Sequence, residues 1–159
     1  NEIDVVITSE PSRLPATVAV THSFQDSFTW IAPAEPAGEF GCISARAKQR
    51  QRAWLERQSY LSLDSGSNTG RMILNWSKRS GLKLRATMEL DSFDQIISFA
   101  VMGMGIACVP QRALSNHSRR GKLKKLKFGP RFERTIVVLI RKQKRTPDYI
   151  ARFVENVLF

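Results

Sequence analysis

The stretch MELDSFDQIISFAVMGMGIACVPQRAL, residues 88–114, carries the patterns of a strand, a helix and a second strand in close succession. Ser92, followed three positions later by Gln95, forms a capping box, which marks the start of a helix. The helix places apolar side chains on one face, namely Phe93, Ile96, Ile97, Ala100 and Val101. Gly103 ends it, and the apolar residues 106–109 predict a strand. This order of elements is typical of a parallel α/β sheet.

The residues before this stretch show the same order of elements. Residues 60–63 predict a strand, residues 69–80 a helix that Gly81 stops, and residues 84–90 a half-covered strand. The polar loop Asp64-Ser65-Gly66-Ser67-Asn68 lies between the first strand and the helix. Residues 60–110 therefore predict alternating strands and helices.

The outer segments predict further strands and two helices. Strands are expected at residues 4–8, 18–24, 28–32, 123–128 and 135–140, with turns at Gln25-Asp26-Ser27 and Gly129-Pro130. Residues 44–58, rich in Arg and Gln, predict an exposed basic helix. Thr146 and Pro147 form a helix start, and the helix after them presents Ile150, Phe153, Val154, Val157 and Leu158 on one side.

Composition excludes several classes of protein. The chain has 159 residues, 25 Lys and Arg against 14 Asp and Glu, and a formal net charge of +11. The longest apolar run, residues 99–110, is about half as long as a membrane span requires, which argues against an integral membrane protein. Cys42 and Cys108 are expected to be free thiols in a reducing compartment. Because the chain starts at Asn1 and enters a strand almost at once, we expect the natural polypeptide to begin upstream.

No arrangement of residues indicates catalysis. His22 and His117 are 95 positions apart and have no metal-ligand spacing, so no metal site is expected. A nucleophile elbow and a Walker loop are missing, and the glycines at 103 and 105 follow a helix where a dinucleotide-binding turn would follow a strand. We therefore expect no enzyme activity, no catalytic residue and no cofactor.

Two polar loops follow predicted strands and open predicted helices. They are residues 65–69 and residues 90–92. Free N–H groups at a helix start, together with hydroxyl groups, bind carboxylates and other anions, and such loops lie where open parallel sheets bind ligands. The alternative is plain helix capping, which we prefer for Ser92 and leave open for residues 65–69.

Basic residues are concentrated near the end of the chain. Residues 111–145 hold thirteen of the 25 Lys and Arg against one acid, Glu133. These basic residues have two interpretations. They form a surface that contacts the DNA backbone or raises the local concentration of anions. Alternatively, they form a solvated rim in which Lys side chains prevent edge strands from pairing with other strands. The second interpretation is preferred.

Residues 88–114 closely resemble a segment of the LysR-type transcriptional regulators. The residues that match the family's pattern are Glu89, Ser92, Val101, Gly105, Ile106, Ala107 and Pro110. Residues 4–7 resemble the strand of the family's third β-α unit, and residues 139–147 with the closing helix resemble its end. The similarity runs in order along nearly the whole chain.

The resemblance implies the effector-binding domain of these regulators, with an α/β fold of the periplasmic-binding-protein type 2 class. That fold has two lobes with mostly parallel sheets. Lobe one would comprise residues 1–31 and 107–159, lobe two residues 32–106, and the crossing strands would lie near residues 28–33 and 105–110. Two β-α units of lobe one would precede Asn1, which makes this lobe incomplete here. Residues 44–57 are more basic than the matching segment of the family.

The resemblance also implies a function. A small, often anionic metabolite would bind between the lobes without reacting, and would change how homodimers or homotetramers place an N-terminal helix-turn-helix, outside this chain, on DNA in the bacterial cytoplasm. The effector-binding residues carried over by position are Ser9, Ser65, Gly66, Ser67, Asn68, Thr69, Asp91, Ser92 and Phe93. The alternatives are a type 2 solute-binding protein of a transport system and a stand-alone basic domain that binds nucleic acid.

Overall fold

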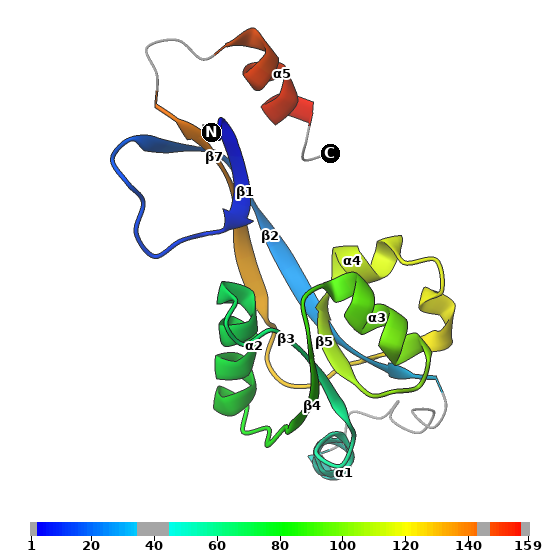
Figure 1. Cartoon of the computed structure of the whole chain (residues 1–159). Coiled ribbons are helices and arrows are strands. Elements are labelled where there is room, and N and C mark those ends of the chain that lie inside the picture. The colour runs from blue at the N-terminus through cyan, green and yellow to red at the C-terminus, as the bar shows by residue number, and fades with distance from the viewer. Residues whose placement is uncertain (1–2, 35–44, 143–146, 157–159) are drawn as a thin grey trace. The chain divides into compact units, whose positions relative to one another are not determined.

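The computed structural model describes residues 3–34, 45–142 and 147–156, with the backbone alone at residues 45–48. The chain divides into two compact units. The smaller unit contains residues 1–26 and 133–159, and the larger unit contains residues 27–132. The lobe boundaries expected at residues 31/32 and 106/107 stay a prediction. Figure 1 shows the elements of both units.

The larger unit alternates strands with helices as the sequence predicted. Its elements are the second half of β2 (Val18–Pro33), α1 (Ala45–Leu55), β3 (Tyr60–Leu63), α2 (Asn68–Arg79), β4 (Ala86–Leu90), α3 (Phe93–Val101), β5 (Ala107–Pro110), α4 (Gln111–Asn116), the 3-10 turn η2 (Arg120–Lys122) and β6 (Leu123–Leu126). The sequence did not predict α4 or η2, because their six and three residues are too short to show a helical period.

Strand directions differ between the two sheets. β3 and β4 are parallel, with Leu63 opposite Leu90, and an isolated parallel bridge joins Tyr60 to Ile106. β2, in contrast, is antiparallel to both β5 and β6. The sequence led us to expect mostly parallel sheets, and parallel pairing is found where a helix connects neighbouring strands. Parallel pairing is not found between β2 and its partners β5 and β6, which lie more than 70 positions later in the chain.

The core of the larger unit has an aromatic side and an aliphatic side. Adjacent residues of a strand point to opposite faces of the sheet, so Trp30 joins the aromatic cluster while Ile31 joins the aliphatic one. The same alternation separates Tyr60 from Leu61. The aromatic cluster includes Phe28, Trp30, Tyr60, Trp76 and Phe132, and the aliphatic cluster includes Ile31, Leu61, Ile96, Ile97 and Val109. Their rings and branched side chains fix the positions of α2 and α3 on the sheet.

The smaller unit is built from β1 (Val5–Ser9), the first half of β2, β7 (Glu133–Arg141) and α5 (Asp148–Asn156). β1 runs antiparallel to β7. Ile150 and Val154 of α5 pack with Val138 in a small core, whereas Phe153 is 50% exposed. Exposed apolar side chains also occur on its strands, at Val6, Ile7 and Val20. Val157, Leu158 and Thr146, which the sequence assigned to this helix and its cap, lie outside the described residues.

The turn predicted at residues 25–27 is wrong, because β2 continues without interruption from Val18 to Pro33. The burial of Asp26 explains why the predicted turn is absent. Its side chain is buried, and the Arg134 guanidinium donates to its Oδ2 from Nε at 2.9 Å and from Nη2 at 2.8 Å. A polar tripeptide is typical of a turn only when water solvates it, and here a partner 108 positions away replaces the water.

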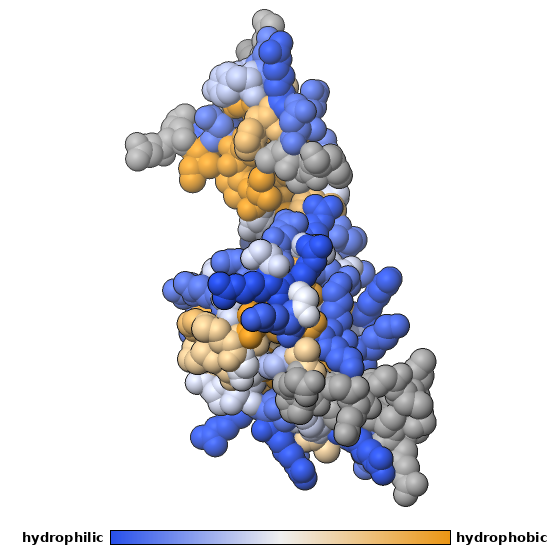
Figure 2. Space-filling view, turned by 90° about the vertical axis from the view of Figure 1, so that its right-hand side faces the viewer, coloured by the Kyte–Doolittle hydropathy of each residue, from blue (hydrophilic) through white to orange (hydrophobic). Residues whose placement is uncertain are grey.

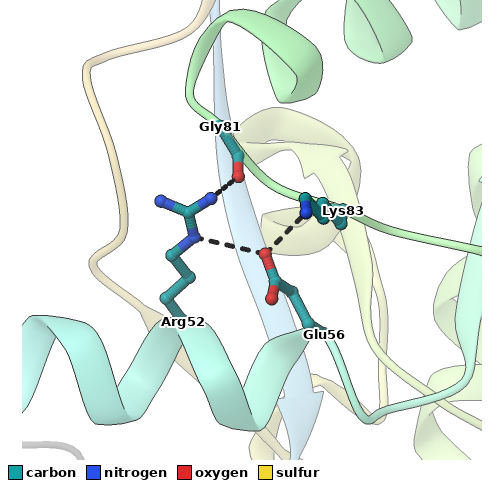
Figure 3. A network of polar contacts seen from close by, with 4 residues as sticks. All are labelled: Arg52, Glu56, Gly81 and Lys83. Carbon is teal, nitrogen blue, oxygen red and sulfur yellow. Dashed lines mark hydrogen bonds and ion pairs between the residues drawn. The ribbon is translucent and has the colours of Figure 1, made fainter.

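The basic helix predicted from residues 44–58 forms, as α1, but it is not exposed all around. Leu55 is fully buried and Gln51 is 6% exposed, so one face packs against the unit. Arg52 belongs to a polar network of four residues, which Figure 3 shows. Its Nε donates to Oε1 of Glu56 at 3.2 Å, and its guanidinium also donates to the carbonyl of Gly81. The backbone N–H of Lys83 donates to the same Glu56 oxygen at 3.0 Å.

Glu56 gives this network a pH dependence. The Lys83 N–H, together with the Arg52 guanidinium, holds the pKa of the Glu56 carboxyl below its ordinary value of 4.5. A lowered pKa contributes stability above the ordinary pKa, and this stability is lost as the pH falls through the lowered value. We therefore expect Glu56→Gln to reduce the free energy of unfolding by less than about 1 kcal/mol at pH 7. Urea unfolding at a series of pH values should show this difference shrinking below pH 4.5.

The control is Glu155→Gln, which removes one negative charge from an exposed position of α5. A difference between Glu56→Gln and the original chain that stays constant through the acid range would contradict the assigned role of Glu56.

Candidate functional site

The two polar loops predicted from the sequence lie side by side in the larger unit. β3 and β4 are adjacent and parallel, so their carboxyl ends meet at one edge. The N–H of Asp64 donates to the carbonyl of Leu90 at 2.9 Å, and the Ser65 hydroxyl lies 3.5 Å from Oε2 of Glu89. The loop before α2 and the loop before α3 are thus neighbours, as expected for the ligand-binding edge of a parallel sheet.

The first loop is wound tightly around Ser67. The Ser67 hydroxyl donates to the Asp64 carbonyl at 2.7 Å and accepts from the Gly70 N–H at 2.9 Å, which caps α2. The Asp64 carboxylate accepts the Gly66 N–H at 2.9 Å. A Cβ at Gly70 would lie 2.0 Å from the Asp64 carbonyl oxygen, so only glycine fits there. Capping therefore accounts for Ser67.

Capping does not account for the other residues of this loop. Ser65, Gly66 and Asn68 are exposed, and Thr69 is 7% exposed in the first turn of α2. The hydroxyl and amide side chains of Ser65, Asn68 and Thr69, beside the positive end of a helix, suit an anionic or polar ligand. Their role in binding stays a prediction.

The second loop is capped in the same way. The Ser92 hydroxyl accepts the N–H of Gln95 at 3.3 Å, so the capping that we preferred for Ser92 is present. Asp91 is exposed, whereas Phe93 is partly buried and packs edge-on against Phe28, with ring centroids 5.8 Å apart. Phe93 thus ties the loop to the aromatic cluster.

Ser9 ends β1 in the smaller unit, where its Cα partner is Ile136. The structure groups Ser65–Thr69 with Asp91–Phe93, and the inclusion of Ser9 in the same site stays a prediction. Glu89 is the neighbour that sequence reasoning missed at this edge. Glu89 is next to the last residue of a strand in which apolar and polar residues alternate, and this position could have indicated that it lies at the edge.

A serine and a histidine meet in the larger unit. The Ser98 hydroxyl lies 3.2 Å from Nε2 of His117, and Nδ1 of His117 accepts the N–H of Arg119 at 3.2 Å. Because Nδ1 accepts, the ring proton of a neutral imidazole is on Nε2, which then donates to Ser98. An imidazole in this tautomer cannot take the proton of the serine hydroxyl.

Burial holds two side chains of the larger unit, the Cys108 thiol and the Tyr60 hydroxyl, in their neutral forms. Cys108 is a buried free thiol, and burial raises the pKa of this thiol well above its ordinary value. Burial, with a smaller contribution from Cys108, likewise raises the pKa of the Tyr60 hydroxyl. Cys42 lies outside the described residues. Among residues 3–34, 45–142 and 147–156, no group of three or more His, Cys, Asp and Glu is placed to hold a metal ion, and no helix of these ranges is long and apolar enough to span a bilayer.

Comparison with known proteins identifies the fold. Residues 1–158 match the family model of the LysR substrate binding domain. The regulatory domain of CcmR from Synechocystis PCC6803, in complex with 2-PG, is similar with a TM-score of 0.72 and 23% identity, over 99% of this chain and 73% of that chain. The effector binding domain of QuiR, in complex with shikimate, has a TM-score of 0.70 and 13% identity, over 96% and 68% of the two chains.

A longer structure also matches. Full-length CbnR in complex with its target DNA has a TM-score of 0.68 and 19% identity, over 96% of this chain and 51% of that chain. The comparison with curated proteins gave no match. The periplasmic-binding-protein type 2 α/β fold that the resemblance implied is therefore confirmed. The alternative of a solute-binding transport protein is not supported, since the matching model is that of the transcriptional regulators.

Proposed function

Since the chain belongs to the family of LysR substrate binding domains, we propose that it senses a small effector for a bacterial LysR-type transcriptional regulator. The observation that carries the proposal is the pair of adjacent loops, Ser65–Thr69 and Asp91–Phe93, at the carboxyl ends of two parallel strands. The regulator acts in the cytoplasm as a homodimer or homotetramer, and it binds DNA through a helix-turn-helix outside this chain.

The chemistry of the loops favours binding through hydrogen bonds. Hydroxyl and amide side chains beside two helix starts offer both donors and acceptors, and the helix starts add a partial positive charge. A small metabolite with several hydroxyl groups fits this set, and a carboxylate or phosphate group on it would face the helix starts rather than the side chains of Asp64, Glu89 and Asp91. The neighbours that bind 2-PG and shikimate are consistent with such a ligand.

Binding without reaction is part of the proposal. A base near Ser98 would be needed for nucleophilic catalysis, and the tautomer of His117 does not provide it. The energy of effector binding instead shifts the populations of two domain geometries, to the extent that the effector prefers one of them.

Thr69→Val is expected to weaken effector binding about tenfold, the effect of losing one hydrogen bond of about 1.4 kcal/mol. The side chain keeps its shape and loses only the hydroxyl. The measurement is the melting temperature of the chain against a panel of carboxylates and phosphate esters that includes shikimate, because a ligand that binds only the folded state raises it. Because Thr69 already interacts with another group of the chain, the melting temperature of the variant without ligand is measured first. Ser67 is avoided because its replacement would remove the cap of α2.

Thr87→Val is the matched control. The Thr87 hydroxyl donates to the Tyr60 carbonyl at 3.2 Å, at the other end of β4, so this variant loses a hydroxyl outside the loops. Equal weakening in both variants, or consumption of the bound compound, would rule out the proposed site.

A further inference from the structure

We propose that residues 111–132 of the larger unit, called the basic segment here, contact the sugar-phosphate backbone of duplex DNA. The inference rests on the proposed function to the extent that DNA is the partner of the regulator. It concerns a different surface from the two loops, and the charge, the fold and the surface chemistry of the segment each support it.

The charge of the segment has one sign. It contains eight Lys and Arg and no Asp or Glu, which gives a formal charge of +8 against +11 for the whole chain. These residues are Arg112, Arg119, Arg120, Lys122, Lys124, Lys125, Lys127 and Arg131, and all but Lys124 are exposed. A surface that serves only solubility carries both signs interspersed.

Protection of an edge strand accounts for only two of the eight basic residues. β6 pairs with β2, and its lysines, Lys124 and Lys125, would discourage a further strand from pairing there. The other six lie outside the strand, on α4, in or beside η2, and after β6. The preference for a solvated edge, drawn from the sequence, therefore does not explain most of the charge.

The backbone of the segment is held in place. Leu123 and Leu126 anchor β6 in the aliphatic and the aromatic cluster, respectively. His117 accepts the Arg119 N–H and contacts Ser98 of α3, and the Arg120 guanidinium donates to the carbonyl of Ser115. Exposed basic side chains on an ordered backbone are the usual means by which proteins hold phosphates, because they lose less conformational entropy on binding.

Within residues 27–34 and 45–132, the carboxylates gather elsewhere. The described ones are Glu56, Asp64, Glu89, Asp91 and Asp94, which lie at the end of α1 and near the carboxyl ends of β3 and β4. Figure 2 views the side of the larger unit that carries α4 and η2, where strongly hydrophilic side chains cover much of the surface. A surface with many exposed basic side chains attracts a polyanion.

The surface chemistry favours nucleic acid over an acidic protein. Protein interfaces have an apolar centre with aromatic or Met side chains. The large apolar side chains that are exposed in the described residues include Leu74, Met102 and Met104, and none of them belongs to the basic segment. Phosphates need no apolar centre, since released counterions supply most of the binding free energy.

The test is the salt dependence of binding to a duplex of arbitrary sequence, measured by fluorescence anisotropy. The variant replaces Arg119, Lys122, Lys125 and Lys127 with Gln. Arg112, Lys124 and Arg131 are left because they already interact with other groups of the chain, and Arg120 because of its bond to Ser115. If all four contact phosphates, the slope of log K against log salt should become shallower by about 3.6, at about 0.9 for each phosphate.

The matched control replaces Lys78, Arg79, Lys83 and Arg85, four exposed basic residues of the same unit, with Gln. Both variants lower the net charge from +11 by four, to +7. The control should keep the original slope. An equal change in both variants, no binding of the original chain at low salt, or equal displacement by poly-glutamate would each overturn the proposal.

Two further measurements keep the outcome clear. Circular dichroism and the melting temperature check that the variants fold, and the double variant Arg119→Gln with Lys127→Gln should show about half of the change in slope. Thr69→Val should leave the salt slope unchanged, so failure of the effector site and failure of the basic segment are distinguishable.

Discussion

Gly105→Ala is expected to lower the free energy of unfolding by about 3 kcal/mol, among the largest effects of any single methyl group in this chain. A Cβ at this position would lie 2.3 Å from the carbonyl oxygen of Ser59 and 3.0 Å from its carbonyl carbon. Both atoms belong to the backbone, so no change of rotamer relieves the contact.

The surrounding hydrogen bonds prevent the backbone from moving away. The same Ser59 oxygen accepts the N–H of Ile106 at 2.8 Å, and the N–H of Leu61 donates to the Ile106 carbonyl at 2.9 Å. These two bonds join the start of β3 to the start of β5 through the parallel bridge at Tyr60. Room for the methyl group would require lengthening them, at a cost added to that of overpacking.

Thermal or urea unfolding measures the effect, and Gly121→Ala provides the control. A Cβ at Gly121 meets no atom within 4 Å, and this residue lies in η2, so the change should stay within about 0.5 kcal/mol. Similar stabilities of the two variants would show that the contact at Ser59 is relieved at little cost.

Arg134→Leu is expected to cost about 3–5 kcal/mol, because it leaves the Asp26 carboxylate buried without its cation. The side chains of Arg134 and Asp26 are 15% and 6% exposed, and two charge-assisted hydrogen bonds join them. Asp26→Leu should cost less, because the longer and more exposed Arg134 side chain can reach water.

The double variant, Asp26→Leu with Arg134→Leu, should recover part of the loss. It buries two apolar groups where each single variant leaves a charge, and replacement of a buried ion pair by apolar residues is often neutral. Urea unfolding of the three variants completes a double-mutant cycle. Additive losses would mean that the pair contributes no coupling and that β2 and β7 hold together without it.

Local patterns predicted most helices and strands of the larger unit. The apolar stripe after Ser92 predicted α3, and the cap that the pattern requires is present in the structure. The same reasoning placed β3, α2 and β5 to within about two residues, since caps and apolar periodicity act within one turn of a helix or one face of a strand.

The candidate site could be predicted only in part. The polar loops were found from their composition, and the parallel pairing of β3 with β4 followed from the helix between them. The structural roles of the individual residues in the first loop could not be predicted in this way. Ser67 caps α2 and Gly70 meets the Asp64 carbonyl, which are three-dimensional contacts within a stretch whose residues look alike in the sequence.

The sequence by itself determined the α/β class, the order of elements from residue 60 to residue 110, and the family, because each depends on residues close together in the chain. The tertiary structure alone decided that β2 is a single strand, that Asp26 is buried, and that β2 is antiparallel to β5 and β6. Each of these depends on a partner more than 70 positions away, as Arg134 is for Asp26 and Cys108 is for Trp30. Burial by a distant partner changes the free energy of a polar residue by more than local propensity does.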